Sequence, residues 1–343
     1  MKDSRKNGTR YCPICGRKLV KNGHYANGKI RLYCKNCKKS YLVNKKANKA
    51  LKQYHWKNKY ANYLCSKQSI NDLKIPRSTF WRHTKSLSFE NFVKYPCPKK
   101  VKCIALDGTW TGNCCYLIAT GTLEGSNEQI PLISMRTDIE KYLTWKEVIN
   151  QLPECDYFVC DAQKGLLKAI QELRPNAKIQ ICIFHIWKTI RTKLSLHPET
   201  DAGKLLLQIA RFLLSKVKES NDLDLETKIA LFVNWLEDWH NKYQDFIKER
   251  TYSADGKHWF YTHRNVRSAY RTLKKHLDKN YLFQFATSKN VPRTNNGIEG
   301  GINSNIKRLI WMHRGSSYKK RNDIIMLYLN NRSMIAAKKL WGN

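Results

Sequence analysis

Three acidic residues, far apart along the chain, stand in surroundings that suit metal binding. Asp107 follows the largely apolar run 101–106, Asp161 follows the apolar run 157–160, and Glu299 lies in a segment rich in glycine and asparagine. A carboxylate held on a rigid element is a common ligand for a divalent cation. A single acid of this kind more often belongs to a turn or a helix cap, so the prediction depends on all three together. We predict that they converge on divalent metal ions.

The order of the apolar segments predicts how the first two acids meet. The runs predict strands at 101–106, 115–120, 129–135, 156–160 and 177–184, and helices at 143–152 and 166–173. Three strands in an antiparallel meander, then a helix, a strand, a helix and a strand, is the order of an α/β ribonuclease H-like core. Such a core has a mixed five-stranded sheet whose first and fourth strands are neighbours. We therefore expect Asp107 and Asp161 to lie side by side.

Polar residues near His185 and Glu299 would complete this site. Cys182 and His185 end the fifth predicted strand, and Thr294 can cap a helix that places Glu299 and Asn303 on one face. Two ligands do not make a metal site, so Cys182 and His185 are expected to support a carboxylate or a phosphate. The residues predicted to support the carboxylates or to contact DNA phosphates are His185, Cys182, Asn295, Asn296, Asn303, Lys307, Arg308, His313 and Arg314.

The charge of the chain is large and unevenly distributed. The 343 residues carry a formal net charge of +36. Residues 1–100 hold 26 Lys and Arg against three acids, whereas the other 243 residues hold 37 Lys and Arg against 24 acids. A basic surface of this size binds polyanions through counterion release. Because the hydrophobic content of 42% excludes a largely disordered chain, we predict a folded protein that binds nucleic acid.

Four cysteines near the N-terminus have the spacing of a zinc site. They form two CxxC pairs that are separated by 18 residues, with short predicted strands at 23–25 and 30–33 between them. Four thiolates at such spacing bind one tetrahedral Zn²⁺ and leave no open position for catalysis. The alternative, a redox CxxC pair, lacks a surrounding βαβ pattern. We predict a structural zinc ribbon over residues 1–48, with these ligands: Cys12, Cys15, Cys34 and Cys37.

The next segment has the layout of a helix-turn-helix. A helix is predicted over 49–65, Ile70 and Leu73 mark a short apolar face, Pro76 interrupts it, and Ser78 can cap a second helix over about 77–87. In that layout the second helix enters the major groove of DNA. An ordinary helical hairpin is the alternative. We assign the helix-turn-helix to residues 49–98, and its expected DNA contacts are Arg77, Thr79, Arg82 and His83.

Long amphipathic segments within residues 189–290 predict an all-helical insertion in the core. Its aromatic residues belong to its core or stack on unpaired bases. The predicted domains are a zinc ribbon (1–48), a helix-turn-helix (49–98), the first part of the core (99–188), the insertion (189–290) and the rest of the core with Glu299 (291–343). The N-terminal residues show no secretory signal, and no run of about 18 apolar residues occurs. A cytoplasmic protein associated with the nucleoid is therefore expected.

Over roughly residues 100–335 the chain resembles bacterial insertion-sequence transposases of the DDE class, in the Mutator-like group. The resemblance rests on Asp107-Gly108, on CDAQKG at 160–165, on Cys182-x-x-His185, and above all on TNNGIEGGINSNIK at 294–307. The metal-binding acids of that family map to Asp107, Asp161 and Glu299. The long gap between the last two fits the helical insertion of the family. One departure is that Ala162-Gln163 follows Asp161, where the family usually has a glycine.

The resemblance implies a transposase that binds terminal inverted repeats, cuts DNA at the element ends and joins the freed 3′-OH to target DNA. It implies two Mg²⁺ or Mn²⁺ ions about 3.5–4 Å apart, held by Asp107, Asp161 and Glu299. The zinc ribbon and the helix-turn-helix would recognise the repeats. Because two DNA ends must be joined, a homodimer or a larger synaptic complex is expected.

Two other functions are compatible with the sequence. One is a DNA-binding regulator that kept the fold and lost catalysis, although the complete set of acids argues against it. The other is a ribonuclease H-like nuclease, such as a junction resolvase, that does not transfer strands. The basic N-terminal segments, which would read a specific DNA sequence, argue against the nuclease.

Overall fold

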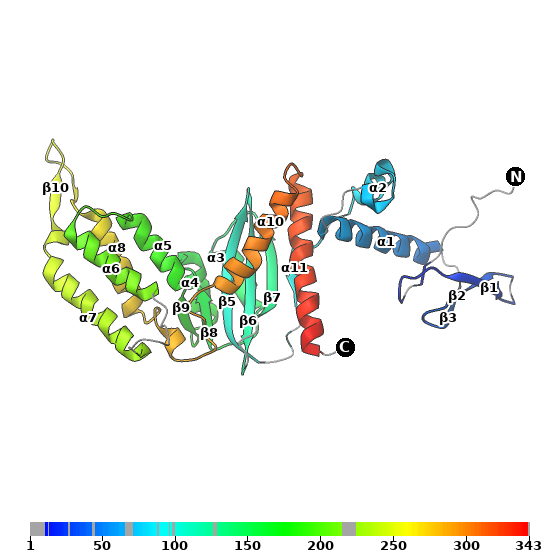
Figure 1. The fold of residues 1–343 in the computed structure, drawn as a ribbon, viewed down its shortest axis with the longest axis horizontal. Coiled ribbons are helices and arrows are strands. Elements are labelled where there is room, and N and C mark those ends of the chain that lie inside the picture. The colour runs from blue at the N-terminus through cyan, green and yellow to red at the C-terminus, as the bar shows by residue number, and fades with distance from the viewer. Residues whose placement is uncertain are drawn as a thin grey trace. The chain divides into compact units, whose positions relative to one another are not determined.

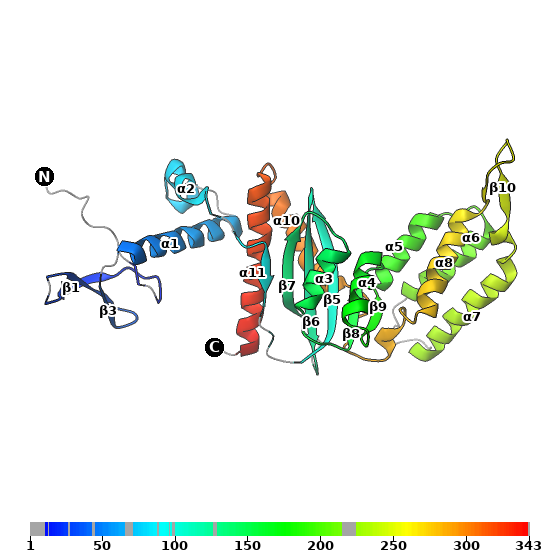
Figure 2. The same cartoon turned by 180° about the vertical axis from the view of Figure 1, so that it is seen from behind.

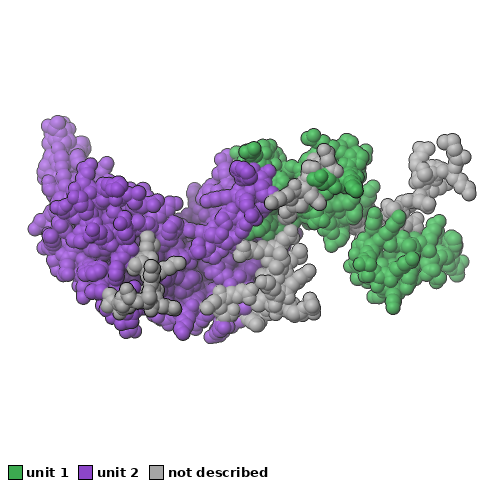
Figure 3. Space-filling model, in the orientation of Figure 1, with its two compact units in different colours: residues 1–89, 313–328 green, residues 90–312, 329–343 purple. Residues whose placement is uncertain are grey.

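The computed structural model describes residues 11–341 except 13, 27, 43–44, 66–70, 88, 96, 98–99, 126–128 and 215–223. The chain forms two compact units, which Figure 3 shows in different colours. Unit 1 comprises residues 1–89 and 313–328, and unit 2 comprises residues 90–312 and 329–343. The five predicted domains stay a prediction. None of the described helices has the length and apolar character that crossing a membrane requires.

Unit 2 is built on a mixed sheet in the strand order β4-β7-β6-β5-β8-β9 (Figures 1 and 2). Its strands are β4 (Phe92–Lys94), β5 (Val101–Thr111), β6 (Cys114–Leu123), β7 (Gln129–Thr137), β8 (Tyr157–Cys160) and β9 (Lys178–Ile181). The ladders of β4–β7, β7–β6 and β6–β5 are antiparallel, whereas those of β5–β8 and β8–β9 are parallel. The predicted neighbourhood of the first and fourth core strands is therefore confirmed. The prediction of five strands was one short, because β4 adds a sixth at the β7 edge.

The centre of the sheet is buried on both faces. All ten residues of β6 are buried, as is usual for a strand covered on both sides. Helices α3 (Tyr142–Asn150) and α4 (Lys164–Leu173) contribute Trp145, Ile149 and Ile170 to the core. That same core continues without a break into the helical insertion. The acidic site described below thus lies on a rigid, well-packed support.

The predicted end of β5 was wrong. Asp107 was expected where the strand stops, but β5 continues to Thr111. The antiparallel ladder with β6 runs on to the Gly112–Asn113 turn, where Thr111 pairs with Cys114. On the other side, the parallel ladder with β8 ends at the pair Ala105–Val159. Asp107 therefore lies inside its strand, but beyond the end of one of its two ladders.

The fifth core strand was also predicted too long. β9 ends at Ile181, and α5 (Ile183–Leu194) begins immediately after Cys182. Cys182 N–H still donates to Cys160 O at 2.7 Å, and Ile186 N–H then donates to Cys182 O at 3.2 Å, which begins the helix. A short apolar run does not distinguish a buried strand from a buried helix turn. As a result, His185 lies in the first turn of α5.

The insertion is not entirely helical, contrary to the prediction. Its elements are α6 (Asp201–Leu214), α7 (Leu225–Tyr243), a 3₁₀ turn (Phe246–Lys248), β10 (Arg250–Tyr252), β11 (Trp259–Tyr261) and α8 (Arg264–Asp278). The two short strands pair as an antiparallel hairpin. They are rich in aromatic and threonine side chains, which favour strands. Gly256, with φ +66°, allows the tight turn between them.

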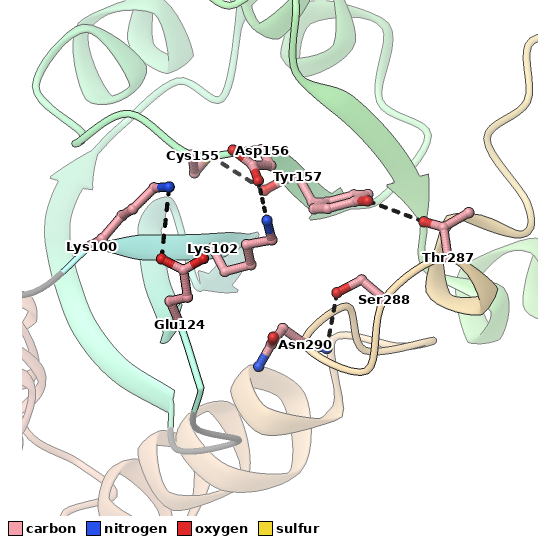
Figure 4. Close-up of polar contacts among 9 residues, drawn as sticks. All are labelled: Lys100, Lys102, Glu124, Cys155, Asp156, Tyr157, Thr287, Ser288 and Asn290. Atoms are coloured by element: carbon pink, nitrogen blue, oxygen red, sulfur yellow. Dashed lines mark hydrogen bonds and ion pairs between the residues drawn. The ribbon is translucent and has the colours of Figure 1, made fainter.

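The segment that carries Glu299 returns from the insertion to the sheet. After a 3₁₀ turn (Gln284–Ala286), Thr287 and Tyr157 share a hydroxyl hydrogen bond of 3.1 Å (Figure 4). The next elements are α9 (Asn296–Ile298), a π-helical turn (Glu299–Asn303), α10 (Ser304–Met312) and α11 (Tyr318–Trp341). The predicted cap at Thr294 was wrong, since the residue before the first helical one is Asn295, whose side chain makes no capping bond.

In unit 1, an antiparallel three-stranded sheet precedes helices with aromatic contacts. Its elements are β1 (Val20–His24), β2 (Ile30–Cys34), β3 (Lys39–Leu42), α1 (Lys45–Cys65), a 3₁₀ turn (Asn71–Leu73) and α2 (Arg77–Thr84). Phe80 of α2 is fully buried and lies 5.2 Å from the Tyr63 ring of α1. Pro76, rather than Ser78, precedes α2, and no side chain caps that helix. Ile70 lies outside the described residues.

Candidate metal centre

Asp107 is held in a defined orientation beneath the surface. Only 6% of the residue is exposed, and Asn303 Nδ2 donates to Asp107 Oδ2 at 2.8 Å. These two residues are 196 positions apart in the chain. Asn303 is itself buried. The C-terminal segment therefore orients the carboxylate of the first core strand.

Asp107, His185 and Glu299 form one group of candidate ligands. One ligand atom from each residue lies within 4.8 Å of the other two. His185 Nε2 is 3.0 Å from Glu299 Oε1, and about a quarter of each of these two side chains is exposed. The group thus combines a buried carboxylate with two side chains that are open to solvent. Sequence reasoning gave His185 a supporting role only, but its ring lies among the candidate ligands.

Asp161 is not one of these three candidate ligands, but its negative charge contributes to the raised pKa of Asp107. If the β5–β8 register continued beyond Ala105–Val159, Asp161 would fall opposite Asp107. The backbone N–H of Gln163 donates to Asp161 Oδ1 at 3.1 Å, and the Gln163 side chain accepts a 2.8 Å bond from Trp145 Nε1–H. Gln163, which stands in the segment that departs from the family pattern, thereby fixes the loop after β8.

The pKa of Asp107 is raised from 3.8 to about 7. Burial is the largest cause, followed by the negative charge of Glu299 and, further down, those of Asp161 and Glu140; the hydrogen bond from Asn303 opposes the shift. A buried carboxylate close to several others is unfavourable in its ionised form. A bound cation would relieve this cost directly.

Glu140 is a fourth acid near the site, and sequence reasoning missed it. Its Oε2 accepts a 2.8 Å hydrogen bond from Trp110 Nε1–H, and the Cys115 thiol lies 3.6 Å away. Glu140 comes three residues after β7. This strand runs in the same direction as β5, β8 and β9, so the carboxyl ends of all four lie on the same side of the sheet. In open α/β sheets, functional residues gather just beyond the carboxyl ends of the strands. That rule, applied to the third strand as well as the others, would have identified Glu140.

Gly108 allows the carboxylate of Glu140 to lie close to the β5 backbone. A Cβ atom at position 108 would lie 2.4 Å from Oε1 and 2.7 Å from Cδ of Glu140. Gly108→Ala should therefore displace the Glu140 side chain, break its bond to Trp110 and lower the free energy of unfolding by about 1–2 kcal/mol. Urea unfolding curves measure this loss.

A double-mutant cycle tests whether the Glu140 side chain causes the loss of stability in Gly108→Ala. In a Glu140→Ala background, Gly108→Ala should cost less than about 0.5 kcal/mol, because the obstructing carboxylate is gone. An equal loss in both backgrounds would show that Glu140 is not the obstacle.

Asn295 joins the segment before Glu299 to β5 and to the end of β9. Its Nδ2 donates to Leu106 O at 2.8 Å, its backbone N–H donates to Cys182 Sγ at 3.3 Å, and the residue is completely buried. Asn295 and Cys182 therefore support protein backbone and do not face a phosphate. Asn296, in contrast, is exposed. The sequence had grouped the two asparagines together, because their neighbouring positions carry no sign of opposite orientation.

Several buried polar atoms around the site have no hydrogen-bond partner among the described residues. They are Asn295 Oδ1, Asn303 Oδ1 and His185 Nδ1. An unpaired buried acceptor is costly, and such atoms in a folded protein are usually satisfied by water, an ion or a ligand. The two carboxylates and the His185 ring are themselves a donor set that fits a divalent cation.

The four N-terminal cysteines form a second group of candidate ligands. Their sulfur atoms lie within 4.8 Å of one another, with Cys12 and Cys37 at 3.8 Å and Cys15 and Cys34 at 3.5 Å. Tetrahedral Zn²⁺ with bonds of about 2.3 Å separates its sulfurs by roughly 3.8 Å. Burial would raise the pKa of Cys12, but hydrogen bonds from the Cys15 backbone and the Tyr41 hydroxyl outweigh it and lower that pKa to about 6. The cluster thus favours the thiolate form at Cys12.

The residues predicted to contact DNA differ in their surroundings. Arg77 and Arg82 on α2 are exposed, Thr79 is half-buried, and the His83 ring stacks on Trp56 at 4.4 Å. In unit 2, Lys307 and Arg308 on α10 are exposed. In unit 1, Arg314 is exposed, whereas His313 Nε2 donates to Leu64 O at 3.0 Å. His313 and His83 therefore have contacts within the protein, and the exposed arginines and Lys307 are the better-placed cations.

One family profile matches part of the chain. Residues 101–251 match the sequence profile described as "Transposase, Mutator family", which confirms the resemblance to the Mutator group over that segment. Among solved structures the chain is similar to one titled "Drosophila P element transposase strand transfer complex", at 10% identity over 90% of this chain and 84% of that chain. The TM-score is 0.24, too low to inform on the fold. No curated protein matches the chain.

Proposed function

We propose that the protein is a DDE transposase with a ribonuclease H-like core, because residues 101–251 match the profile of Mutator-family transposases. It would bind terminal inverted repeats, cut DNA at the element ends and transfer the freed strand to target DNA. One observation carries the proposal: Asp107, His185 and Glu299, from three distant segments, present ligand atoms within 4.8 Å of one another. Glu299, which lies outside the matched segment, reaches the site predicted around Asp107.

Asp107, Asp161 and Glu299 would hold the Mg²⁺ or Mn²⁺ ions. Bound divalent ions would supply an activated water and charge stabilisation for the leaving 3′ oxygen. The chain itself orients the ligands: Asn303 fixes one oxygen of Asp107 and leaves the other available, while His185 holds Glu299. Asn295 locks the β5 backbone one residue before Asp107. Residues held in this way lose little freedom when the substrate arrives.

Unit 1 would provide DNA recognition. Residues 1–100 carry a large excess of positive charge, and the cysteine group suits one structural Zn²⁺. Arg77, Thr79, Arg82 and His83 are proposed DNA contacts of a helix-turn-helix, with the exposed arginines as the strongest candidates. Their role would be to place the element end, whereas Lys307 and Arg308 would bind phosphates beside the carboxylates.

The reaction would proceed in two steps of the same kind. Hydrolysis at the element end frees a 3′-OH, and this hydroxyl then attacks a target phosphodiester, so the number of phosphodiester bonds is unchanged in the second step. Joining two ends requires at least two active sites in one assembly, so we propose a homodimer or a larger synaptic complex.

Cleavage and joining of inverted-repeat DNA by wild type and by Asp161→Asn tests the proposal. The variant should lose cleavage by about 1,000-fold, since a metal ligand supports several kcal/mol of transition-state stabilisation. Asp156→Asn is the matched control, because Asp156 lies directly before β8 and Asp161 lies directly after it. Asp156 is exposed and forms an ion pair with Lys102 (Figure 4). Removing such a surface pair should change activity little.

The outcomes separate the candidate functions. Equal cleavage by wild type and Asp161→Asn would remove Asp161 from the site. DNA binding by the wild type without metal-dependent nicking would favour the regulator. Nicking without joining of a precut end would favour the nuclease.

A further inference from the structure

The β10–β11 hairpin presents aromatic side chains on one face. Tyr252 pairs with Trp259 across the two strands, and Arg250 pairs with Tyr261. Side chains two positions apart on a strand lie on the same face, so these four residues share one face of the ribbon. Phe260, opposite Thr251, lies on the other face.

Three of the aromatic residues of the hairpin are exposed, unlike most large ones of the insertion. Tyr252 is 61% exposed, Trp259 45% and Phe260 52%, whereas Trp239 of α7 is 1% exposed. A two-stranded ribbon has no core of its own to hold them. A cluster of exposed aromatic side chains generally marks a binding surface.

The base and the tip of the hairpin are well fixed. At the base, Thr251 and Thr262 share a hydroxyl hydrogen bond of 2.8 Å, and His263 is 3.0 Å from Glu249. At the tip, Ser253 N–H donates to His258 O at 2.9 Å. Figure 1 shows the hairpin extending beyond helices α6 and α8. The aromatic pair is therefore presented on a preorganised arm, which lowers the entropy cost of binding.

Positive charge surrounds the aromatic face. The Arg250 guanidinium lies 4.0 Å from the centre of the Trp259 ring, and that of Arg267 lies 3.8 Å from the Tyr261 ring. Residues 248–275 hold eight Lys and Arg against two acids. The occupant that complements this surface carries both flat apolar groups and negative charge. A nucleic acid strand with unpaired bases has both.

We propose that the Tyr252–Trp259 face stacks on one or more unpaired bases of a DNA strand. The proposal rests on the proposed function and extends it, because it assigns single-stranded DNA to a surface outside the carboxylate site. Bases inside a duplex already stack on each other, so their faces are not available to a protein ring. Frayed or opened ends supply such faces, and the neighbouring arginines and lysines would bind the phosphates of the same strand.

The test compares the affinity of the full-length protein for a single-stranded oligonucleotide and for the matching duplex, at one fixed salt concentration. A 2-aminopurine base in the single strand reports stacking as fluorescence quenching. Trp259→Ala and Tyr252→Ala should each weaken single-strand binding on the order of tenfold and reduce the quenching, while duplex binding changes less than twofold. Trp259→Phe should retain most of both signals. Trp235→Ala is the control, since Trp235 is also 40% exposed but lies on α7.

The results distinguish this proposal from the proposed function. If the alanine variants bind both duplex and single-stranded DNA as tightly as the wild type does, the proposed stacking surface is wrong and the transposase proposal stands. If the variants lose self-association in sedimentation experiments and keep single-strand binding, the face contacts a second copy of the chain, which also overturns the proposal. A wild type that binds neither form of DNA would overturn both proposals.

Discussion

Asp107→Asn should abolish DNA cleavage and at the same time stabilise the metal-free protein. Under the proposed function, the loss of cleavage should reach about 1,000-fold or more, because a proposed ligand of the metal ions is removed. The gain in stability follows from the pKa of Asp107, which is about 7 in the folded protein against an ordinary value of 3.8. Removing this buried charge should raise the free energy of unfolding by on the order of 3 kcal/mol at pH 8.

The stability gain of Asp107→Asn over the wild type should increase with pH. Between about pH 4 and pH 7 the folded protein holds a proton on Asp107 that the unfolded chain has released. The contribution of Asp107 to the free energy of unfolding therefore falls as the pH rises through this range, and it stays constant above it. The difference between Asp107→Asn and wild type should grow from pH 5 to pH 8. Urea unfolding at a series of pH values, with a chelator present, measures it.

Without metal, Asp107→Asn should be more stable than the wild type, and added Mn²⁺ should make the wild type the more stable of the two. The wild type should gain stability with increasing Mn²⁺ concentration, because the ion binds the folded protein, whereas Asp107→Asn should gain much less. Calorimetry should also show proton release on Mn²⁺ binding near pH 6, since the cation displaces the proton from Asp107. A variant that is less stable than wild type at pH 8 without metal would contradict the assigned environment of Asp107.

Loss of the metal at the cysteine group should unfold the N-terminal ribbon. The binding free energy of structural zinc is about 10–16 kcal/mol in small domains and is at the same time their folding free energy. Cys34→Ser removes a fully buried candidate ligand, so the zinc content should fall from the proposed one ion per chain to nearly none. Metal analysis of the purified protein, together with the circular dichroism spectrum, checks this result. Binding to inverted-repeat DNA should fall at least tenfold.

Cys155→Ser is the matched control for the zinc experiment. Cys155 belongs to unit 2, and its thiol donates to Tyr157 O at 3.3 Å, a bond that a serine hydroxyl can replace. This variant should retain both zinc and DNA binding. Full zinc occupancy in Cys34→Ser would contradict the four-cysteine site. Normal DNA binding without zinc would mean that the ribbon does not take part in recognition.

The parts of the site that could be predicted from the sequence depended on local patterns. The spacing of the four cysteines was enough to group them, because a tetrahedral site fixes short ligand spacings. The placement of the Asp107 strand beside the Asp161 strand followed from the order of the apolar runs, and the parallel ladder confirms it. The motif around Glu299 drew attention to a residue that the structure brings to Asp107.

The parts that could not be predicted depend on contacts between distant segments. His185 lies on a helix rather than a strand, because hydrogen bonds from Ile181 N–H to Tyr281 O and from Ile183 N–H to Arg293 O accompany the end of β9. Glu140 carries no local motif; only the rule on strand ends points to it, and its contacts with Trp110 and Gly108 place it near Asp107. The β10–β11 hairpin escaped notice because its strands are three residues long, shorter than the period-two pattern needed to recognise them.

The stretch from Glu299 to Tyr328 gives the molecule a particular order of assembly during synthesis. It supplies Glu299 and Asn303 to the carboxylates of unit 2, and in unit 1 Asp323 accepts hydrogen bonds from Tyr60 and Phe89. During translation, at about 5–20 residues per second, these residues emerge from the ribosome after nearly all the residues that they contact. A nascent chain that stops before Glu299 therefore has an incomplete version of both units. Under the proposed function, a product interrupted before Glu299 would lack a proposed metal ligand and the Asn303 amide that orients Asp107, so it could not cut DNA.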